Sequence, residues 1–228
     1  MTPKRIAIVG KNAEAIRPMV EEAGFVVLEQ EPEMVASYGG DGTLMVAEHV
    51  YPGVPKVILK DSLICKMCSV LPNDEVLRRV AQGQYTMTEL IKLEVHVGTD
   101  TLYALNDITV HNDNPRHALR YTVAINGKSV GTTIIGDGVV VATPLGSTAY
   151  YRSITDSFFE LGIGIAFNNS TEQSDHMVLH DTSEIRIAIV RGPASVYADN
   201  QEREIVVGEG AEIVIAKSSE VSSIVVVE

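Results

Sequence analysis

The chain has 228 residues, with 30 Asp and Glu against 18 Lys and Arg, which gives a formal net charge of −12. A surface this acidic repels nucleic acids and anionic membranes, so we expect neither as a partner. The longest apolar runs, such as 139–142 and 224–227, are far shorter than the roughly 20 residues that span a bilayer. The N-terminal residues lack the long apolar stretch of a signal peptide. A cytoplasmic location is therefore expected.

The first third of the chain alternates strand and helix patterns. Gly24 follows the first helix as a C-terminal stop, and Asn73 or Asp74 would cap the third. Strands separated by helices predict a parallel α/β domain over residues 1–85. The expected strands are 5–9, 25–28, 34–37 and 57–59, and the expected helices are 14–23, 43–50 and 73–82.

After Gly83 the pattern changes to short strands separated by turn signals, among which Asn126-Gly127 is the strongest hairpin signal. One helix is expected, over 147–161. This pattern predicts a β-rich domain of layered sheets over 86–228, with the last strand free to return to the first domain. The expected strands are 86–97, 101–110, 120–125, 129–135, 138–142, 184–190, 195–197, 204–207 and 212–216.

Two cysteines, Cys65 and Cys68, form a single C-x-x-C. A zinc site would require a second pair or suitably spaced histidines, and a redox motif would require a thioredoxin-like context. We interpret them as two thiols in a partly buried loop, with a redox switch as the open alternative. No residue is predicted as a metal ligand.

A glycine cluster, Gly39-Gly40-Asp41-Gly42-Thr43, lies between an expected strand and an expected helix. The glycines allow a ligand to approach the backbone, and a helix N-terminus favours a phosphate. Asp41 suits an acid that accepts a hydrogen bond from a hydroxyl, or works with a metal ion, during phosphoryl transfer. The alternative is a tight turn with Asp41 as a helix cap. The cluster is neither a P-loop nor the dinucleotide fingerprint.

Two further segments carry polar groups at expected strand ends. The first is Ala104-Leu105-Asn106-Asp107, and the second runs from Gly136-Asp137-Gly138 to Thr143-Pro144-Leu145-Gly146-Ser147-Thr148-Ala149-Tyr150. Small hydroxyl side chains and free N–H groups can bind the edge of an adenine, and a tyrosine can lie against a ring. The alternative for the second segment is a Pro-Gly turn with Ser147 as a helix N-cap.

Together these motifs resemble those of the NAD kinase family. The glycine cluster alone is shared with lipid kinases and 6-phosphofructokinases, whereas the second segment is similar to a long stretch specific to NAD kinases. The resemblance covers roughly positions 35 to 205. It implies an NAD-kinase/diacylglycerol-kinase-like fold, with a Rossmann-like parallel sheet in the α/β domain and a second domain that binds the dinucleotide and forms the oligomer.

The resemblance also implies an activity, the transfer of a phosphoryl group to the 2′-hydroxyl of the adenosine ribose of NAD to give NADP. ATP, another nucleotide or polyphosphate would be the donor, accompanied by Mg²⁺, and the assembly would be a homodimer or homotetramer. Two alternatives stay open: a non-catalytic NAD(P)-binding protein, and a lipid or sugar kinase of the same superfamily.

Residue roles follow from the same resemblance. Asp41 would be the general base or the hydroxyl-orienting acid, and with Gly42 it would meet the acceptor ribose. Asn106 and Asp107 would bind ribose hydroxyls on the adenine side, and Asp137 the nicotinamide-side ribose. Residues 148–153 would surround the adenine, and Gln201 would match the family's D-G-Q. The remaining substrate-binding residues implied are Gly40, Thr43, His117, Thr143, Ser147, Thr148, Ala149, Tyr150 and Ser153.

Four departures from the family pattern are expected to mark the chain as a divergent, short member, one of them being an end at Glu228, short of the C-terminal helix that many members have. The segment 60–70 replaces a Gly-rich loop that lines the dinucleotide in the family. Ile135 stands where the family often has an Arg, which removes a cation from the site. The segment 175–180 replaces one that contains Pro-His and Arg-Pro.

Overall fold

The computed structural model describes residues 4–63, 65–171 and 175–228. Ile64 of the divergent loop and the first three residues therefore lie outside the described residues. The chain forms two compact units: Met1–Leu90 together with Glu220–Glu228, and Ile91–Ser219. No helix in the described part of the chain is long and apolar enough to cross a membrane.

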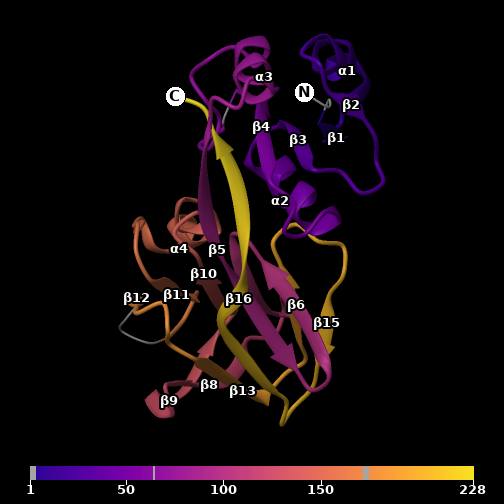
Figure 1. Ribbon diagram of the computed structural model, residues 1–228. Coiled ribbons are helices and arrows are strands. Elements are labelled where there is room, and N and C mark those ends of the chain that lie inside the picture. Colours follow the sequence, from indigo (N-terminus) through magenta and orange to yellow (C-terminus); the bar gives the residue numbers. More distant parts are fainter. Residues whose placement is uncertain (1–3, 64, 172–174) are drawn as a thin grey trace. The chain divides into compact units, whose positions relative to one another are not determined.

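The first unit is a parallel sheet covered by helices, and its elements are labelled in Figure 1. The strands run in the order β2-β1-β3-β4, and the last residues of β16 pair with β4 in the same direction. The strands are β1 (Arg5–Val9), β2 (Val26–Val27), β3 (Met34–Gly39), β4 (Lys56–Lys60) and the end of β16 (Glu212–Val226). The helices are α1 (Ala13–Glu22), α2 (Asp41–Val50) and α3 (Asn73–Ala81).

Alternation along the strands explains why both faces of this sheet are covered. Successive side chains of a strand point to opposite faces, and both faces of a parallel sheet are normally buried by helices. Ile6 of β1 belongs to the cluster that contains residues of α1 and α3, whereas its neighbour Ala7 packs with Ala47 of α2. Helices α1 and α3 therefore cover one face and α2 the other, as the α/β pattern of the sequence predicts.

The second unit consists of two antiparallel sheets. One contains β8 (Leu119–Ile125), β9 (Lys128–Gly136), β13 (Ile185–Arg191), the beginning of β16 and the hairpin of β5 (Thr86–Val97) with β6 (Asp100–Ala104). The other has the order β12-β11-β10-β7-β14-β15. Its strands are β7 (Asp107–Asn112), β10 (Gly138–Ala142), β11 (Ile163–Asn168), β12 (His176–Leu179), β14 (Ala194–Ala198) and β15 (Ile205–Val207).

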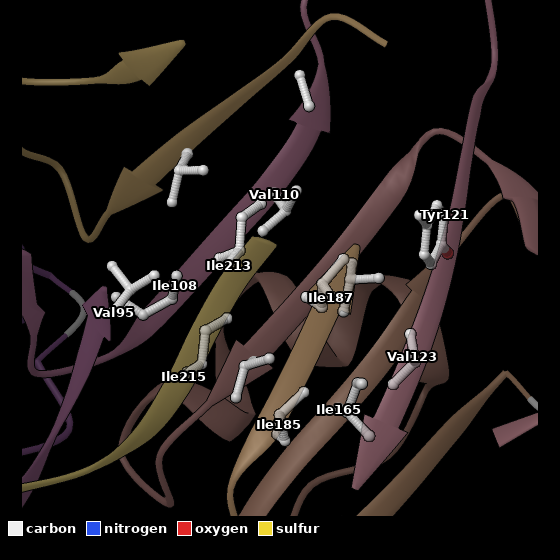
Figure 2. Packing of buried hydrophobic residues seen from close by; sticks show 14 of the residues in the cluster. Val95, Ile108, Val110, Tyr121, Val123, Ile165, Ile185, Ile187, Ile213 and Ile215 are labelled. Carbon is white, nitrogen blue, oxygen red and sulfur yellow. The ribbon is translucent and has the colours of Figure 1, made fainter. Parts of the chain in front are cut away.

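The core of this unit lies between the two sheets. Figure 2 shows Ile108 and Val110 of β7 among side chains of β13 and β16, such as Ile187 and Ile213. Branched aliphatic residues fill this layer, and Tyr121 spans it because its hydroxyl donates to the carbonyl of Gly138, 3.1 Å away. The predicted β-rich fold of layered sheets is confirmed, and it is built with few aromatic rings.

Several local predictions are confirmed and others are wrong. The Asn126-Gly127 hairpin forms between β8 and β9, and both of its residues have positive φ, 50° and 75°. The helix predicted over 147–161 is too long: a single 3₁₀ turn (Gly146–Thr148) precedes α4, which covers only Tyr150–Thr155. Helix α4 ends because Asp156 adopts a left-handed conformation, with φ 52°.

Two other predictions fail at the ends of elements. The strand expected over 101–110 is broken between β6 and β7 at Leu105 and Asn106. The predicted side-chain cap of α3 is also wrong, because Pro72 is its N-cap residue and no side chain caps it. Asn73 instead contacts the end of β4, accepting from the N–H of Lys60 at 2.8 Å and donating to its carbonyl at 3.0 Å.

Candidate functional site

The glycine cluster connects β3 to α2 in the first unit. Gly40 is the N-cap residue of α2, and Asp41, Gly42 and Thr43 begin the helix. Gly39 has to lack a side chain because a Cβ there would overlap the hydroxyl of Thr43. The site therefore lies at the carboxyl end of a parallel strand, which is where open α/β sheets bind ligands.

Asp41 does not cap its own helix through its side chain. Its carboxylate accepts hydrogen bonds from the backbone N–H of Lys66, at 3.1 and 3.0 Å to its two oxygens, and from the N–H of Met67 at 3.3 Å. The alternative interpretation of Asp41 as a helix cap therefore fails, and the contact partners come from the divergent loop that follows β4.

The cysteines of that loop are not two thiols, and this prediction is wrong. Cys65 and Cys68 form a disulfide, with Lys66 and Met67 between them. The C-x-x-C spacing permits such a four-residue ring, but the sequence around it lacks the thioredoxin-like context on which the prediction relied. The bond closes the turn that contacts Asp41.

In the second unit, Asp199 holds the Asn106-Asp107 segment. Its carboxylate accepts from the backbone N–H groups of Leu105 and Asn106, both at 2.7 Å, and of Asp107 at 3.1 Å. Burial raises the pKa of Asp199, and the three amide donors act against that rise. A carboxylate that accepts several amides fixes the backbone of a turn, so Asp199 sets the positions from which the Asn106 and Asp107 side chains extend.

The segment is held on its other side by Thr143 and Gly146. The hydroxyl of Thr143 donates to the carbonyl of Leu105 at 2.7 Å, and its N–H donates to the carbonyl of Asn106 at 2.8 Å. Gly146 packs so closely that a Cβ there would overlap the carbonyl oxygen of Asn106. Thr143 and Gly146 thus act on the shape of the Asn106-Asp107 turn.

We expect Gly146→Ala to lower the free energy of unfolding by about 1–3 kcal/mol, because the added methyl group has to displace backbone. Gly208→Ala is the matched control, since a Cβ at Gly208 meets nothing within 4 Å. Urea unfolding of both variants measures the difference. Equal stability of the two would show that the contact at Asn106 is not tight.

Asp107 is the strongly perturbed acid of this group. Burial, followed by the charge of Asp199, raises its pKa to about 7, while a hydrogen bond from Thr109 acts in the other direction. The side-chain oxygen of Asn106 is buried and has no hydrogen-bond partner among the described residues. Both features suit a bound molecule that brings hydroxyl or amino donors to this turn.

The raised pKa makes stability depend on pH. Because the folded-state pKa lies above the ordinary value of 3.8, the native state binds more protons, and this stabilisation is lost as the pH rises through 7. We expect Asp107→Asn, which cannot ionise, to be more stable than the wild type at pH 8 by about 1–3 kcal/mol, after discounting for partial exposure. At pH 4 the two should be nearly equal.

Urea unfolding at several pH values between 4 and 8 measures this effect. Glu209→Gln is the same kind of change at an exposed turn residue. Its free energy of unfolding should depend on pH as that of the wild type does. If the difference in unfolding free energy between Asp107→Asn and the wild type did not grow with pH, the raised pKa of Asp107 would be contradicted.

Asp137 lies between β9 and β10, where two amide side chains orient its carboxylate. Asn169 donates to one oxygen at 2.6 Å and Asn112 to the other at 3.4 Å. The hydroxyl of Tyr150 accepts from the amide of Asn168 at 3.0 Å. Burial and then the charges of Asp137 and Asp107 raise the pKa of Tyr150, so both carboxylates lie within electrostatic reach of the Tyr150 hydroxyl.

A pocket of about 350 Å³ opens beside this group. Its polar lining and its one tyrosine ring can bind a ring with hydroxyl or amino substituents. It is lined by Tyr150, Ser153, Ile154, Phe167, Asn168, Asn169, Ser170 and Asp175. Two predicted residues, Tyr150 and Ser153, meet here with β11 residues that the sequence did not predict.

The other predicted residues lie around these groups in different ways. Ser147 is fully buried, and its hydroxyl contacts the carbonyls of Pro144 and Phe159 at 2.8 and 2.9 Å. Thr148 donates to the carbonyl of Leu145 at 3.3 Å, and Ala149 is the residue between the 3₁₀ turn and α4. Ser147 and Thr148 therefore shape the turn through hydrogen bonds to its backbone.

His117 contacts the site through its backbone, and the side chain of Gln201 contacts the backbone of Tyr103. The imidazole of His117 belongs to an exposed residue, and it is the backbone carbonyl that accepts from Asn112, at 3.0 Å. Gln201 donates to the carbonyl of Tyr103 at 2.6 Å, just before the Asn106-Asp107 turn. Sequence reasoning missed the roles of Asp199, Asn112, Asn168 and Asn169, and only Asp199 had a signal, its place two residues before Gln201.

No group of three or more His, Cys, Asp or Glu side chains within the described ranges is arranged to hold a metal ion. Mg²⁺ usually binds one or two carboxylates and takes its other ligands from phosphates and water. The single carboxylate of Asp41 fits that limited contribution.

Most of the second unit belongs to a segment that matches a known family. The model of the ATP-NAD kinase C-terminal domain matches residues 105–227. The NAD kinase of Methanopyrus kandleri is 31% identical over 193 residues, which cover 80% of this chain and 66% of the relative. The NAD kinase of Sulfurisphaera tokodaii is 31% identical over 159 residues, or 68% and 62% of the two chains. The chain thus spans slightly less than two thirds of the length of these relatives.

Two solved structures share the fold at low sequence identity. Yeast NADH kinase, crystallised with NADH, superposes with a TM-score of 0.86 at 19% identity. The superposition covers 100% of this chain and 84% of the yeast chain. An NAD kinase from Archaeoglobus fulgidus in complex with ATP gives a TM-score of 0.79 at 20% identity, over 96% and 92% of the two chains.

Proposed function

The chain belongs to the family of ATP-NAD kinase C-terminal domains, and from this premise we propose that it is an NAD kinase that phosphorylates the 2′-hydroxyl of the adenosine ribose of NAD. The observation that carries the proposal is the location of the matched segment. Residues 105–227 contain the Asn106-Asp107 turn, Asp137 and Tyr150, which form the polar group described above.

The proposed roles follow from the chemistry of each side chain. Asp107 and Asp137 accept hydrogen bonds from ribose hydroxyls, and the buried side-chain oxygen of Asn106, which has no partner among the described residues, accepts from a hydroxyl or amino group. The ring of Tyr150 supports a base in the pocket beside it. Asp41 orients the attacking hydroxyl or takes its proton, since phosphoryl transfer requires mainly positioning and charge stabilisation from the protein.

ATP or polyphosphate is proposed as the donor, and Mg²⁺ would accompany its phosphates and neutralise their charge. Asp41 is the residue whose oxygen would contribute to binding that ion. Assembly into a homodimer or homotetramer, the division into domains at residues 85 and 86, and a cytoplasmic location stay predictions.

The proposal is tested by incubating the purified chain with NAD, Mg²⁺ and either ATP or polyphosphate, and measuring NADP by chromatography. We expect NADP with at least one donor. NADH, a diacylglycerol and fructose 6-phosphate serve as competing acceptors. Phosphorylation of the lipid or the sugar without NADP would favour another kinase of the superfamily and overturn the proposal.

One observation favours the second candidate, a non-catalytic NAD(P)-binding protein. The backbone of Lys66 and Met67 occupies acceptor positions of the Asp41 carboxylate, in a loop that departs from the family pattern. Calorimetry with NAD separates the two candidates, because tight binding with no product from any donor would support the binding protein.

A further inference from the structure

A disulfide-closed turn covers the acid to which we assign the chemistry. Lys66 and Met67 lie between the bonded Cys65 and Cys68, and their backbone N–H groups donate to Asp41 at 3.0–3.3 Å. The sulfur of Cys65 lies 3.8 Å from an oxygen of the same carboxylate. The two N–H groups and the cross-link therefore act on one side chain.

Contacts from the described residues take up only part of the acceptor capacity of this carboxylate. A carboxylate has about four lone-pair positions, and the contacts place Lys66 and Met67 on Oδ1 and Lys66 alone on Oδ2. A hydroxyl can still donate to Oδ2. The turn thus fixes the plane of the carboxylate without taking up all of its acceptor capacity.

The loop has little hydrophobic anchorage of its own. Leu63 and Val70, on either side of the turn, are fully exposed. An exposed loop without a cross-link samples many conformations. The disulfide is therefore one constraint that keeps the N–H groups of Lys66 and Met67 on Asp41, beside the hydrogen bond from Ser69 to the carbonyl of Val227 at 3.3 Å.

We propose that the Cys65–Cys68 turn is a positioning element for Asp41, and that reduction of its disulfide slows phosphoryl transfer. This inference rests on the proposed function. The reductant is a small dithiol: it becomes a cyclic disulfide, and the two cysteine sulfurs take up two electrons and two protons to become thiols. Both cysteines are partly exposed, so a thiolate can reach them.

The kinetic test compares the oxidised chain with the same chain treated with dithiothreitol, and free thiols are counted to verify each state. We expect kcat for NADP formation to fall about tenfold on reduction, because a small displacement of a positioned group is costly, while KM for NAD changes by less than about threefold. Cys65→Ser and Cys68→Ser should have the kcat of the reduced wild type, and dithiothreitol should not change it. Leu63→Ser, an exposed change in the same loop, should behave as the wild type.

A second measurement does not depend on activity. Hydrogen exchange at the amides of Lys66 and Met67 should be slow in the oxidised chain and faster after reduction. It should also be faster in oxidised Asp41→Asn, where a charged acceptor is lost. A merely structural disulfide would not link these two amides to Asp41.

The outcomes separate this inference from the proposed function. If exchange becomes faster on reduction but the chain makes no NADP in either state, the disulfide turn positions Asp41 and the proposed kinase function is wrong. Unchanged exchange and unchanged kcat after complete reduction would overturn the positioning role. A rise in kcat on reduction would overturn it too, since the turn would then block Asp41.

Discussion

Asp41→Asn is expected to lower kcat for NADP formation by about 10²–10⁴-fold, while the dissociation constant of NAD stays within a few-fold of the wild-type value. The carboxamide has nearly the same shape, and its single oxygen can still accept from Lys66 and Met67. It cannot take a proton from a hydroxyl, and it lacks the charge that aligns one. The loss therefore falls on turnover. Chromatographic NADP assays and calorimetry with NAD measure the two quantities.

Asp74→Asn is the control for a change of charge in the same unit, because Asp74 is exposed in the first turn of α3. It should leave kcat near the wild-type value. Asp41→Asn with near-normal turnover would show that Asp41 neither orients nor deprotonates the hydroxyl. A large loss of NAD affinity instead would place Asp41 in binding.

Local patterns predicted most of the first unit because its strands and helices carry their own signals. Strand β1 has the predicted bounds, and β3, β4 and the three helices fall within a few residues of theirs. Strand β16 runs on to Val226, although only 212–216 was predicted. Its polar stretch around Ser218 and Ser222 shows no strand pattern, yet both side chains are buried, since partners distant in sequence supply the pairing.

The candidate site divides in the same way. The residues of the motifs could be named because each motif is contiguous in sequence. Their supports could not: Asp199 reaches Asn106 across 93 positions, and Asn169 reaches Asp137 across 32. The disulfide turn on Asp41 was missed for another reason. The family pattern offers no counterpart for the loop, and a C-x-x-C is compatible with free thiols as well as with a bond.

A buried ion pair connects α2 to the sheet of the first unit, away from the residues assigned to chemistry. The side chains of Glu48 and Lys56 are only 5% and 0% exposed and form a salt bridge. Lys56 also donates to the carbonyl of Tyr51 at 2.9 Å, and Ser222 of β16 donates to Glu48 at 2.7 Å. Burial of two charges is costly, so the pair stabilises the fold only while both members are present.

We expect Glu48→Gln to lower the free energy of unfolding by about 3–5 kcal/mol, because it leaves the Lys56 ammonium buried without its carboxylate. Lys56→Met should cost a similar amount for the opposite reason, since the Glu48 carboxylate loses its cation. Urea unfolding monitored by circular dichroism measures both. Glu14→Gln, which removes an exposed pair with Arg17 in α1, should change stability little.

The double variant Glu48→Gln/Lys56→Met tests whether each charge is tolerated only because the other is present. If each charge is tolerated only because of the other, removing both restores most of the stability that either single variant loses, and the coupling between the two positions is large. Additive losses would mean that each side chain stabilises the unit through separate contacts. The role of the pair would then be packing between α2 and the sheet, and its charge would be incidental.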